Sequence, residues 1–180
     1  LLKQRAERYK EKVAFHIIKK GKPYNVSYDS LWKKVIEVGK GLSLFSNQSK
    51  KPTIGLLTHN QFNGVLVDLA CLSFGFKVVP IPLNSTPEHV SYIINHSEIS
   101  HLFICGKIGK KIWGEVKNSH DIIDIDMSEI NTTSNYALNW NSFISSSDTV
   151  EEFDVDRLLA KVDINDIQTV MYTSGTTANP

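Results

Sequence analysis

The chain has 180 residues, of which 41% are hydrophobic, so it is long enough to bury one sizeable core. It carries 20 Lys and Arg against 19 Asp and Glu, which gives a formal net charge of +1. A net charge this small gives no overall electrostatic attraction to nucleic acid or to an anionic membrane, so any phosphate group must be bound by a local group of residues. No stretch approaches the ~18 consecutive apolar residues of a membrane span, and we expect no transmembrane segment.

The two cysteines, Cys71 and Cys105, each lie inside an apolar run, DLACLSF and HLFICG. A small buried hydrophobe explains such a position, and the spacing favours neither a disulfide framework nor a metal site. Cysteine usage therefore indicates a reducing, cytoplasmic setting. Peripheral association with a membrane stays open as a separate possibility.

The first predicted elements are a short surface helix and a β-hairpin. The helix follows from the spacing of Leu2, Ala6 and Tyr9 in LLKQRAERYKEK. Two β-prone runs, VAFHII (13–18) and YNVSY (24–28), flank the turn sequence KKGKP. A long helix should follow, capped by Ser27 or Asp29. Its apolar stripe consists of Leu31, Val35, Val38, Leu42 and Phe45.

From Thr53 onward, short apolar runs alternate with helical patterns. Repetition of this kind indicates parallel βαβ units. We therefore predict an α/β fold with a largely parallel sheet, helices on both faces, and a small β-hairpin before it. The expected segments are TIGLL (53–57), a helix over 62–74, KVVPI (77–81), a helix over 87–95, HLFIC (101–105), a helix over 108–116 and DIIDI (121–125).

Several boundaries are marked by single residues. Asn60 can cap the helix that Gly75 ends, and Thr86 can cap the next helix, with Pro87 at its first position. The polar stretch 128–147 is predicted to be a long surface excursion. A short helix at 155–159 and a final strand at 169–172 should complete the chain.

Other polar residues suggest sites that ordinary structure also explains. His89, His96 and His101 do not share a helical face with carboxylates at ligand spacing, so we predict no metal site. His59, at a predicted strand end, either lines a cleft or simply precedes a helix. Asp121, Asp124 and Asp126 resemble a cation loop but lack its glycine and later Glu, so we interpret them as a strand with a solvated end. GKIGKK (106–111) lacks the spacing of a nucleotide P-loop and is interpreted as a basic, solvent-facing helix start.

The segment with the most chemical content is YTSGTT, a predicted strand that runs into a hydroxyl-rich glycine turn. Glycine lets the backbone approach an anion, and hydroxyl groups donate further hydrogen bonds. In an α/β sheet, a loop at the carboxyl end of a strand is the usual ligand position. An ordinary Ser/Thr turn is the alternative. The candidate phosphate-binding residues are Thr173, Ser174, Gly175, Thr176 and Thr177.

DIQTVMYTSGTTANP resembles, over its whole length, the phosphate-loop signature of the adenylate-forming (AMP-binding) superfamily, YTSGTTG followed by any residue and PKG. The segment 172–177 and Pro180 stand in matching positions, whereas Ala178 stands where the family has Gly. Upstream, VSYDSLWKKVIEVGKGL and the stretch from IGLLTHNQ to ISHLFI are similar to the family pattern in the same order. The chain most resembles the long-chain fatty acyl-CoA synthetases.

The resemblance implies a ligase that uses ATP and Mg²⁺ to activate a carboxylate as its acyl-adenylate and then passes the acyl group to CoA. It divides the chain into residues 1–50, with the first helix, hairpin and long helix, and residues 51–180, the βαβ-type part of the family's large N-terminal domain. The family's loop lysine would follow Pro180, so we expect an N-terminal fragment that is inactive alone and contains no catalytic residue. Two alternatives remain: an adenylation domain that loads a carrier protein, and a degenerate, non-catalytic remnant.

Overall fold

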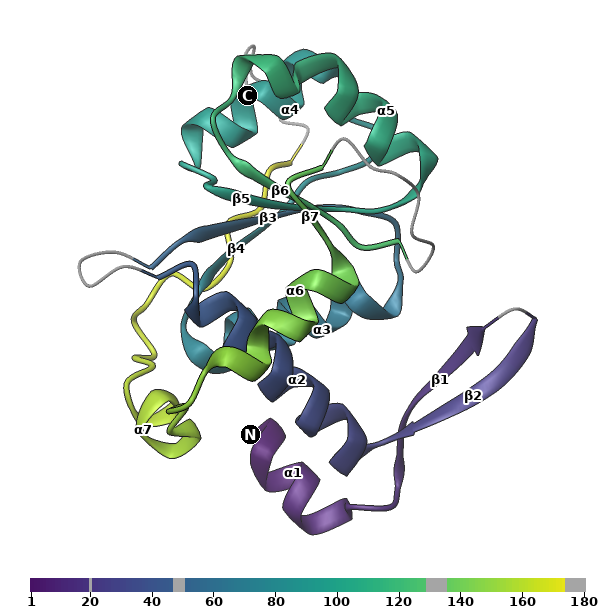
Figure 1. The fold of residues 1–180 in the computed structure, drawn as a ribbon, viewed down its shortest axis with the longest axis vertical. Helices are drawn as coiled ribbons and strands as arrows, with labels where there is room; N and C mark the ends of the chain where they lie inside the picture. Colours follow the sequence, from purple (N-terminus) through teal and green to yellow (C-terminus); the bar gives the residue numbers. More distant parts are fainter. Residues whose placement is uncertain (20, 47–50, 129–135, 174–180) are drawn as a thin grey trace.

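The computed structural model describes residues 1–19, 21–46, 51–128 and 136–173. It is an α/β fold in which a parallel sheet lies between two helical layers, with an antiparallel hairpin projecting to one side (Figure 1). The helices are α1 (Leu2–Tyr9), α2 (Tyr28–Ser43), α3 (Phe62–Phe74), α4 (Pro87–His96), α5 (Gly106–Val116), α6 (Trp140–Ser146) and α7 (Val155–Ala160). The strands are β1 (Val13–Lys19), β2 (Lys22–Ser27), β3 (Thr53–Leu57), β4 (Lys77–Pro80), β5 (His101–Ile104), β6 (Ile123–Asp126) and β7 (Leu138–Asn139).

The five-stranded sheet has the order β4-β3-β5-β6-β7, and every adjacent pair is parallel. Helices α4 and α5 cover one face, and α2, α3 and α6 cover the other (Figure 1). Side chains alternate between these faces: Leu102 and Ile104 join the α4–α5 core, whereas Phe103 joins the opposite core. The predicted fold class is confirmed.

Local signals set most boundaries as predicted. Ser27 caps α2 by accepting a hydrogen bond from the backbone N–H of Ser30 at 3.2 Å, and Thr86 caps α4. Gly75 ends α3 in the left-handed region, with φ of 71°. The predicted cap Asn60 is wrong, because Gln61 accepts the hydrogen bond from the N–H of Asn63 and is the N-cap.

The prediction of a surface excursion over 128–147 is wrong for its second half. Residues 129–135 lie outside the described residues, but β7 adds a strand to the sheet and α6 follows it directly. Trp140 and Phe143 of α6 are buried, and the ring of Phe143 meets that of Phe103 edge to face, with centroids 5.1 Å apart. Two aromatic side chains therefore anchor a polar segment to the sheet.

None of the helices in the described ranges combines the length and the apolar character needed to cross a bilayer.

His101, at the start of β5, is a buried titratable group whose pKa is displaced from its ordinary range. Its ring stacks on Phe45 with centroids 4.1 Å apart, and it is 7% exposed. Burial disfavours the imidazolium and lowers the pKa of His101 from 6.5 to about 4.

We expect this histidine to destabilise the fold in acid. Below pH 6.5 the unfolded chain binds a proton at this histidine, whereas the native state does not bind it until about pH 4. This difference lowers the free energy of unfolding by ~3 kcal/mol, at ~1.4 kcal/mol per pKa unit. Urea unfolding of His101→Phe, which keeps a stacked ring, should show a smaller stability loss between pH 7 and pH 4 than the unsubstituted chain. Equal losses in the two proteins would contradict the assignment.

Candidate functional site

The carboxyl ends of three neighbouring strands meet at one edge of the sheet. The turn after β3 carries His59, Asn60 and Gln61, β5 is followed by Cys105, and β6 is followed by Met127 and Ser128. This edge is where parallel α/β sheets present residues to ligands. The hairpin and α6 approach the same edge (Figure 1). A cleft lies there, lined by residues of both.

The cleft has a volume of about 980 Å³. Its walls come from the hairpin, α2, α3 and α6, and its end is formed by the strand ends. The lining residues are Ile17, Ile18, Tyr24, Lys34, Glu37, Val38, His59, Asn60, Gln61, Phe62, Asn63, Leu66, Cys105, Met127, Ser128, Trp140, Asn141 and Ile144.

His59 lines this cleft and also lies just before α3, so both sequence interpretations hold. Its imidazole packs against the backbone of Gly106, where an added Cβ would come within 2.8 Å of Nδ1. Gly106 has φ of 80°, which also favours glycine. The first residue of GKIGKK therefore makes room for a cleft histidine, a role that sequence spacing does not reveal.

Two aspartates of β6 correct the solvated-strand interpretation, because Asp124 is 8% and Asp126 is 2% exposed. Trp113 donates its indole N–H to Asp124 at 2.6 Å, and the backbone N–H of Ala137 donates to the other oxygen at 2.7 Å. Asp121 is exposed, as predicted. The pattern that resembled a cation loop is thus partly a buried hydrogen-bonding strand.

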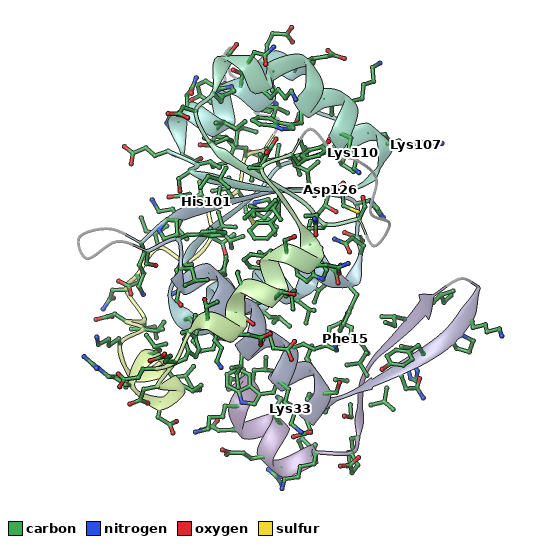
Figure 2. All side chains as sticks on the ribbon, in the orientation of Figure 1. Phe15, Lys33, His101, Lys107, Lys110 and Asp126 are labelled. Atoms are coloured by element: carbon green, nitrogen blue, oxygen red, sulfur yellow. The ribbon has the colours of Figure 1, made fainter. Side chains whose placement is uncertain are left out.

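Asp126 forms a 2.6 Å ion pair with Lys110 of α5, and Figure 2 shows the two residues together while Lys107 lies on the outer side of the helix. The backbone N–H of Ser128 donates to the same carboxylate at 2.9 Å. Burial opposes ionisation, but these bonds outweigh it and hold the pKa of Asp126 below its ordinary value. GKIGKK does begin a helix with exposed Lys107 and Lys111, but Lys110 points inward.

The histidines considered as metal ligands lie apart, in α4 and β5. Within the described ranges, no three His, Cys, Asp or Glu side chains are grouped so that they could hold a metal ion. Cys71 is buried, as the sequence predicted, whereas Cys105 is half-buried at the cleft.

The segment before the predicted phosphate loop lies beside β4. Thr169 bridges Val78 in parallel, but the segment does not form the full strand predicted for 169–172. The hydroxyl of Tyr172 bonds Nδ1 of His96 and Oγ of Ser97, each at 2.6 Å, at the end of α4. Thr173 is exposed, and the other candidate residues, Ser174, Gly175, Thr176 and Thr177, lie outside the described residues, as does Ala178.

A family model described as "AMP-binding enzyme" matches residues 2–180. The chain belongs to the AMP-binding enzyme family. The match runs through the predicted phosphate loop and covers the hairpin, the sheet and both helical layers.

One curated relative and two solved structures show what the chain is similar to beyond the family model. In an alignment 121 residues long that covers 62% of this chain, it is 30% identical to long chain acyl-CoA synthetase 2 of Arabidopsis thaliana, of which it spans 17%. Coronafacic acid ligase from Pectobacterium brasiliense has the same fold with a TM-score of 0.75 and 21% identity, over 95% of this chain and 32% of that one. For a long-chain-fatty-acid-CoA ligase from Archaeoglobus fulgidus the TM-score is 0.70 at 18% identity, over 98% and 34% of the two chains.

The Lys110–Asp126 pair gives an asymmetric stability prediction for this AMP-binding chain. Lys110→Met leaves a carboxylate that is 2% exposed without its cation, whereas Asp126→Asn leaves an ammonium that can still reach water. We expect a loss of ~3 kcal/mol or more for Lys110→Met and a smaller loss for Asp126→Asn, by urea unfolding at pH 7. A larger loss for Asp126→Asn than for Lys110→Met would show that an unpaired, buried Asp126 carboxylate is not the main cause of the lost stability.

The hydroxyl of Tyr172 should hold the edge segment against β4. Removing it in Tyr172→Phe keeps the ring but loses both 2.6 Å bonds, so the amide of Val170, which donates to Val78, should exchange with deuterium about tenfold faster. Tyr92→Phe is the matched control, because the hydroxyl of Tyr92 bonds no described residue although its ring contacts Tyr172. Similar exchange rates in both variants would contradict the role of the hydroxyl.

Proposed function

We propose that this chain supplies the phosphate-binding part of an ATP-dependent carboxylate–CoA ligase. The supporting observation is that the AMP-binding match extends through residue 180 and includes the YTSGTT segment. In the proposed reaction, a carboxylate oxygen attacks the α-phosphorus of ATP and pyrophosphate leaves. The thiol of CoA then attacks the acyl carbon, and AMP leaves.

The proposed phosphate ligands are the backbone N–H groups and hydroxyls of Thr173, Ser174, Gly175, Thr176 and Thr177. This donor set fits the oxygens of the leaving pyrophosphate, since glycine permits close approach and each hydroxyl can donate one hydrogen bond. The two hydroxyl bonds of Tyr172 hold the position immediately before Thr173, which supports the role proposed for the loop. Such a loop acts by position and charge compensation.

Mg²⁺ and CoA belong to the proposal through the family resemblance. The described residues provide no grouped metal ligands, so the steps assigned to this chain involve only phosphate binding and loop placement. The Arabidopsis relative is named a long chain acyl-CoA synthetase, which makes long-chain carboxylates the first substrates to test. Replacing CoA with a carrier protein as acceptor would distinguish the carrier-loading alternative.

Carboxylate-dependent exchange of labelled pyrophosphate into ATP tests the activity in the purified protein that carries this chain. Exchange should require a carboxylate, and Thr176→Val should lower its rate ~10- to 100-fold by removing a hydrogen bond to a charged phosphate oxygen. Thr149→Val deletes the same hydroxyl from a residue of the 3-10 turn after α6, where it donates to the carbonyl of Ser146, and should leave the rate unchanged.

No exchange across short-, medium- and long-chain carboxylates would favour the non-catalytic remnant. For the 180-residue chain alone, we expect no micromolar ATP binding in equilibrium dialysis, because the resemblance places the adenine pocket and catalytic lysine beyond residue 180.

A further inference from the structure

The segment that precedes the proposed phosphate ligands is bonded to the sheet over a short length. Two backbone hydrogen bonds, of 2.9 and 3.0 Å, join it to Val78 of β4, and the N–H of Val170 donates the second. Among the described residues, the backbone of 171–173 forms no hydrogen bond with a strand. Within the described part of the chain, the side chain of Tyr172 therefore makes the last hydrogen bonds before Thr173.

Tyr172 contacts the last turn of α4. His96 is the final residue of that helix, and Ser97 is its C-cap. The Tyr172 hydroxyl lies 2.6 Å from Nδ1 of His96 and 2.6 Å from Oγ of Ser97. The Tyr172 ring meets the rings of Tyr92 and His96 edge to face, with centroids 6.2 and 5.8 Å apart. One end of a helix thus holds both the ring and the hydroxyl of the residue before Thr173.

The end of α4 is itself firmly held. The N–H of Ser97 donates to the carbonyl of Ile93 at 3.0 Å, and the N–H of Ile99 donates to the carbonyl of Ile94 at 3.0 Å. Ser97 and Ile99 are both buried, so this turn is packed into the core beneath α4. Groups carried on a packed helix are positioned more accurately than groups on a loop.

The three polar groups can share their protons in two ways. The Tyr172 hydroxyl has one proton, so it donates to one neighbour and accepts from the other. When Nδ1 of His96 is unprotonated, Tyr172 donates to it and Ser97 donates to Tyr172. When Nδ1 carries a proton, both donations reverse. Both bonds exist in either case, so the contact requires a polar atom at Nδ1 and does not require the charge of an imidazolium.

We propose that His96 and Ser97 are positioning residues for the phosphate loop and act through the hydroxyl of Tyr172. The inference rests on the proposed function and extends it to a helix that supplies none of the proposed phosphate ligands. When the residue before Thr173 occupies its position for a smaller fraction of the time, apparent affinity for the bound phosphates falls by that fraction. Loss of a positioning bond should therefore raise the KM for pyrophosphate and leave the KM for the carboxylate unchanged.

Two opposite substitutions of His96 test this role in the pyrophosphate exchange assay. His96→Phe keeps a ring beside Tyr92 and Tyr172 but removes Nδ1, so it should raise the KM for pyrophosphate about 2- to 10-fold, the usual effect of losing one neutral hydrogen bond. His96→Asn removes the ring but keeps a polar amide atom near the place of Nδ1, and should retain the KM of the unsubstituted protein. Ser97→Ala should act as His96→Phe does.

The same variants separate positioning from other roles of the histidine. Because Asn carries no charge, retention of the KM in His96→Asn excludes an imidazolium that compensates phosphate charge. An unchanged KM for pyrophosphate in His96→Phe, an equal rise in both His96 variants, or an equal rise in the KM for the carboxylate would overturn the proposal.

Hydrogen exchange in the same protein distinguishes failure of this inference from failure of the proposed function. His96→Phe should speed deuterium exchange at the amide of Val170 about 2- to 10-fold. It should add nothing when Tyr172→Phe is already present, because the hydroxyl through which it acts is gone. His89→Phe, two turns earlier on α4, is the matched control because the ring of His89 contacts Tyr92.

Additive effects of His96→Phe and Tyr172→Phe, or faster exchange at Val170 in the His89 control as well, would overturn the positioning role. If the unsubstituted protein exchanges no pyrophosphate into ATP, the proposed function fails and the expected KM effect fails with it. The hydrogen-exchange rates still decide in that case whether His96 holds Tyr172.

Discussion

Burial of the parallel sheet on both faces is the constraint on which the rest of the structure depends. Every residue of β3 is buried, so helices must cover the strand from two sides. The βαβ connections supply α3 on one face and α4 and α5 on the other, where Gly109 lets α5 approach the carbonyl of Leu57. Polar residues follow the carboxyl ends of β3 and β6, and the cleft forms at this edge.

Buried carboxylates stabilise the far side of that edge. Asp124 and Asp126 connect β6 to Trp113 and Lys110 of the same helix, and Asp124 also accepts the N–H that leads into β7. Each carboxylate is acceptable in the interior only because its oxygens receive hydrogen bonds from N–H donors. Removing one of these donors would leave a buried carboxylate oxygen without a partner, which costs stability.

The sequence predicts elements well where periodicity is strong, as in β3, α2 and α3, because a repeated apolar pattern specifies both the element and its buried face. It fails where a contact joins distant segments. Nothing near Asp124 indicates that Trp113 will donate to it, and two aromatic residues in a polar stretch gave little sign of α6. The cleft was unpredictable for the same reason, since the hairpin, α2, α3 and α6 each contribute only part of its lining.

The contacts of Tyr172 and the lining of the cleft belong to opposite helical layers of the sheet. Tyr172 packs against the core beneath α4 and α5, whereas the cleft is enclosed by α2, α3, α6 and the hairpin. Between them lies β3, whose side chains are packed on both faces and cannot shift without opening a core. Energetic coupling between contacts so separated is small unless a shared element has two arrangements. Tyr172 and the cleft therefore depend on separate sets of contacts.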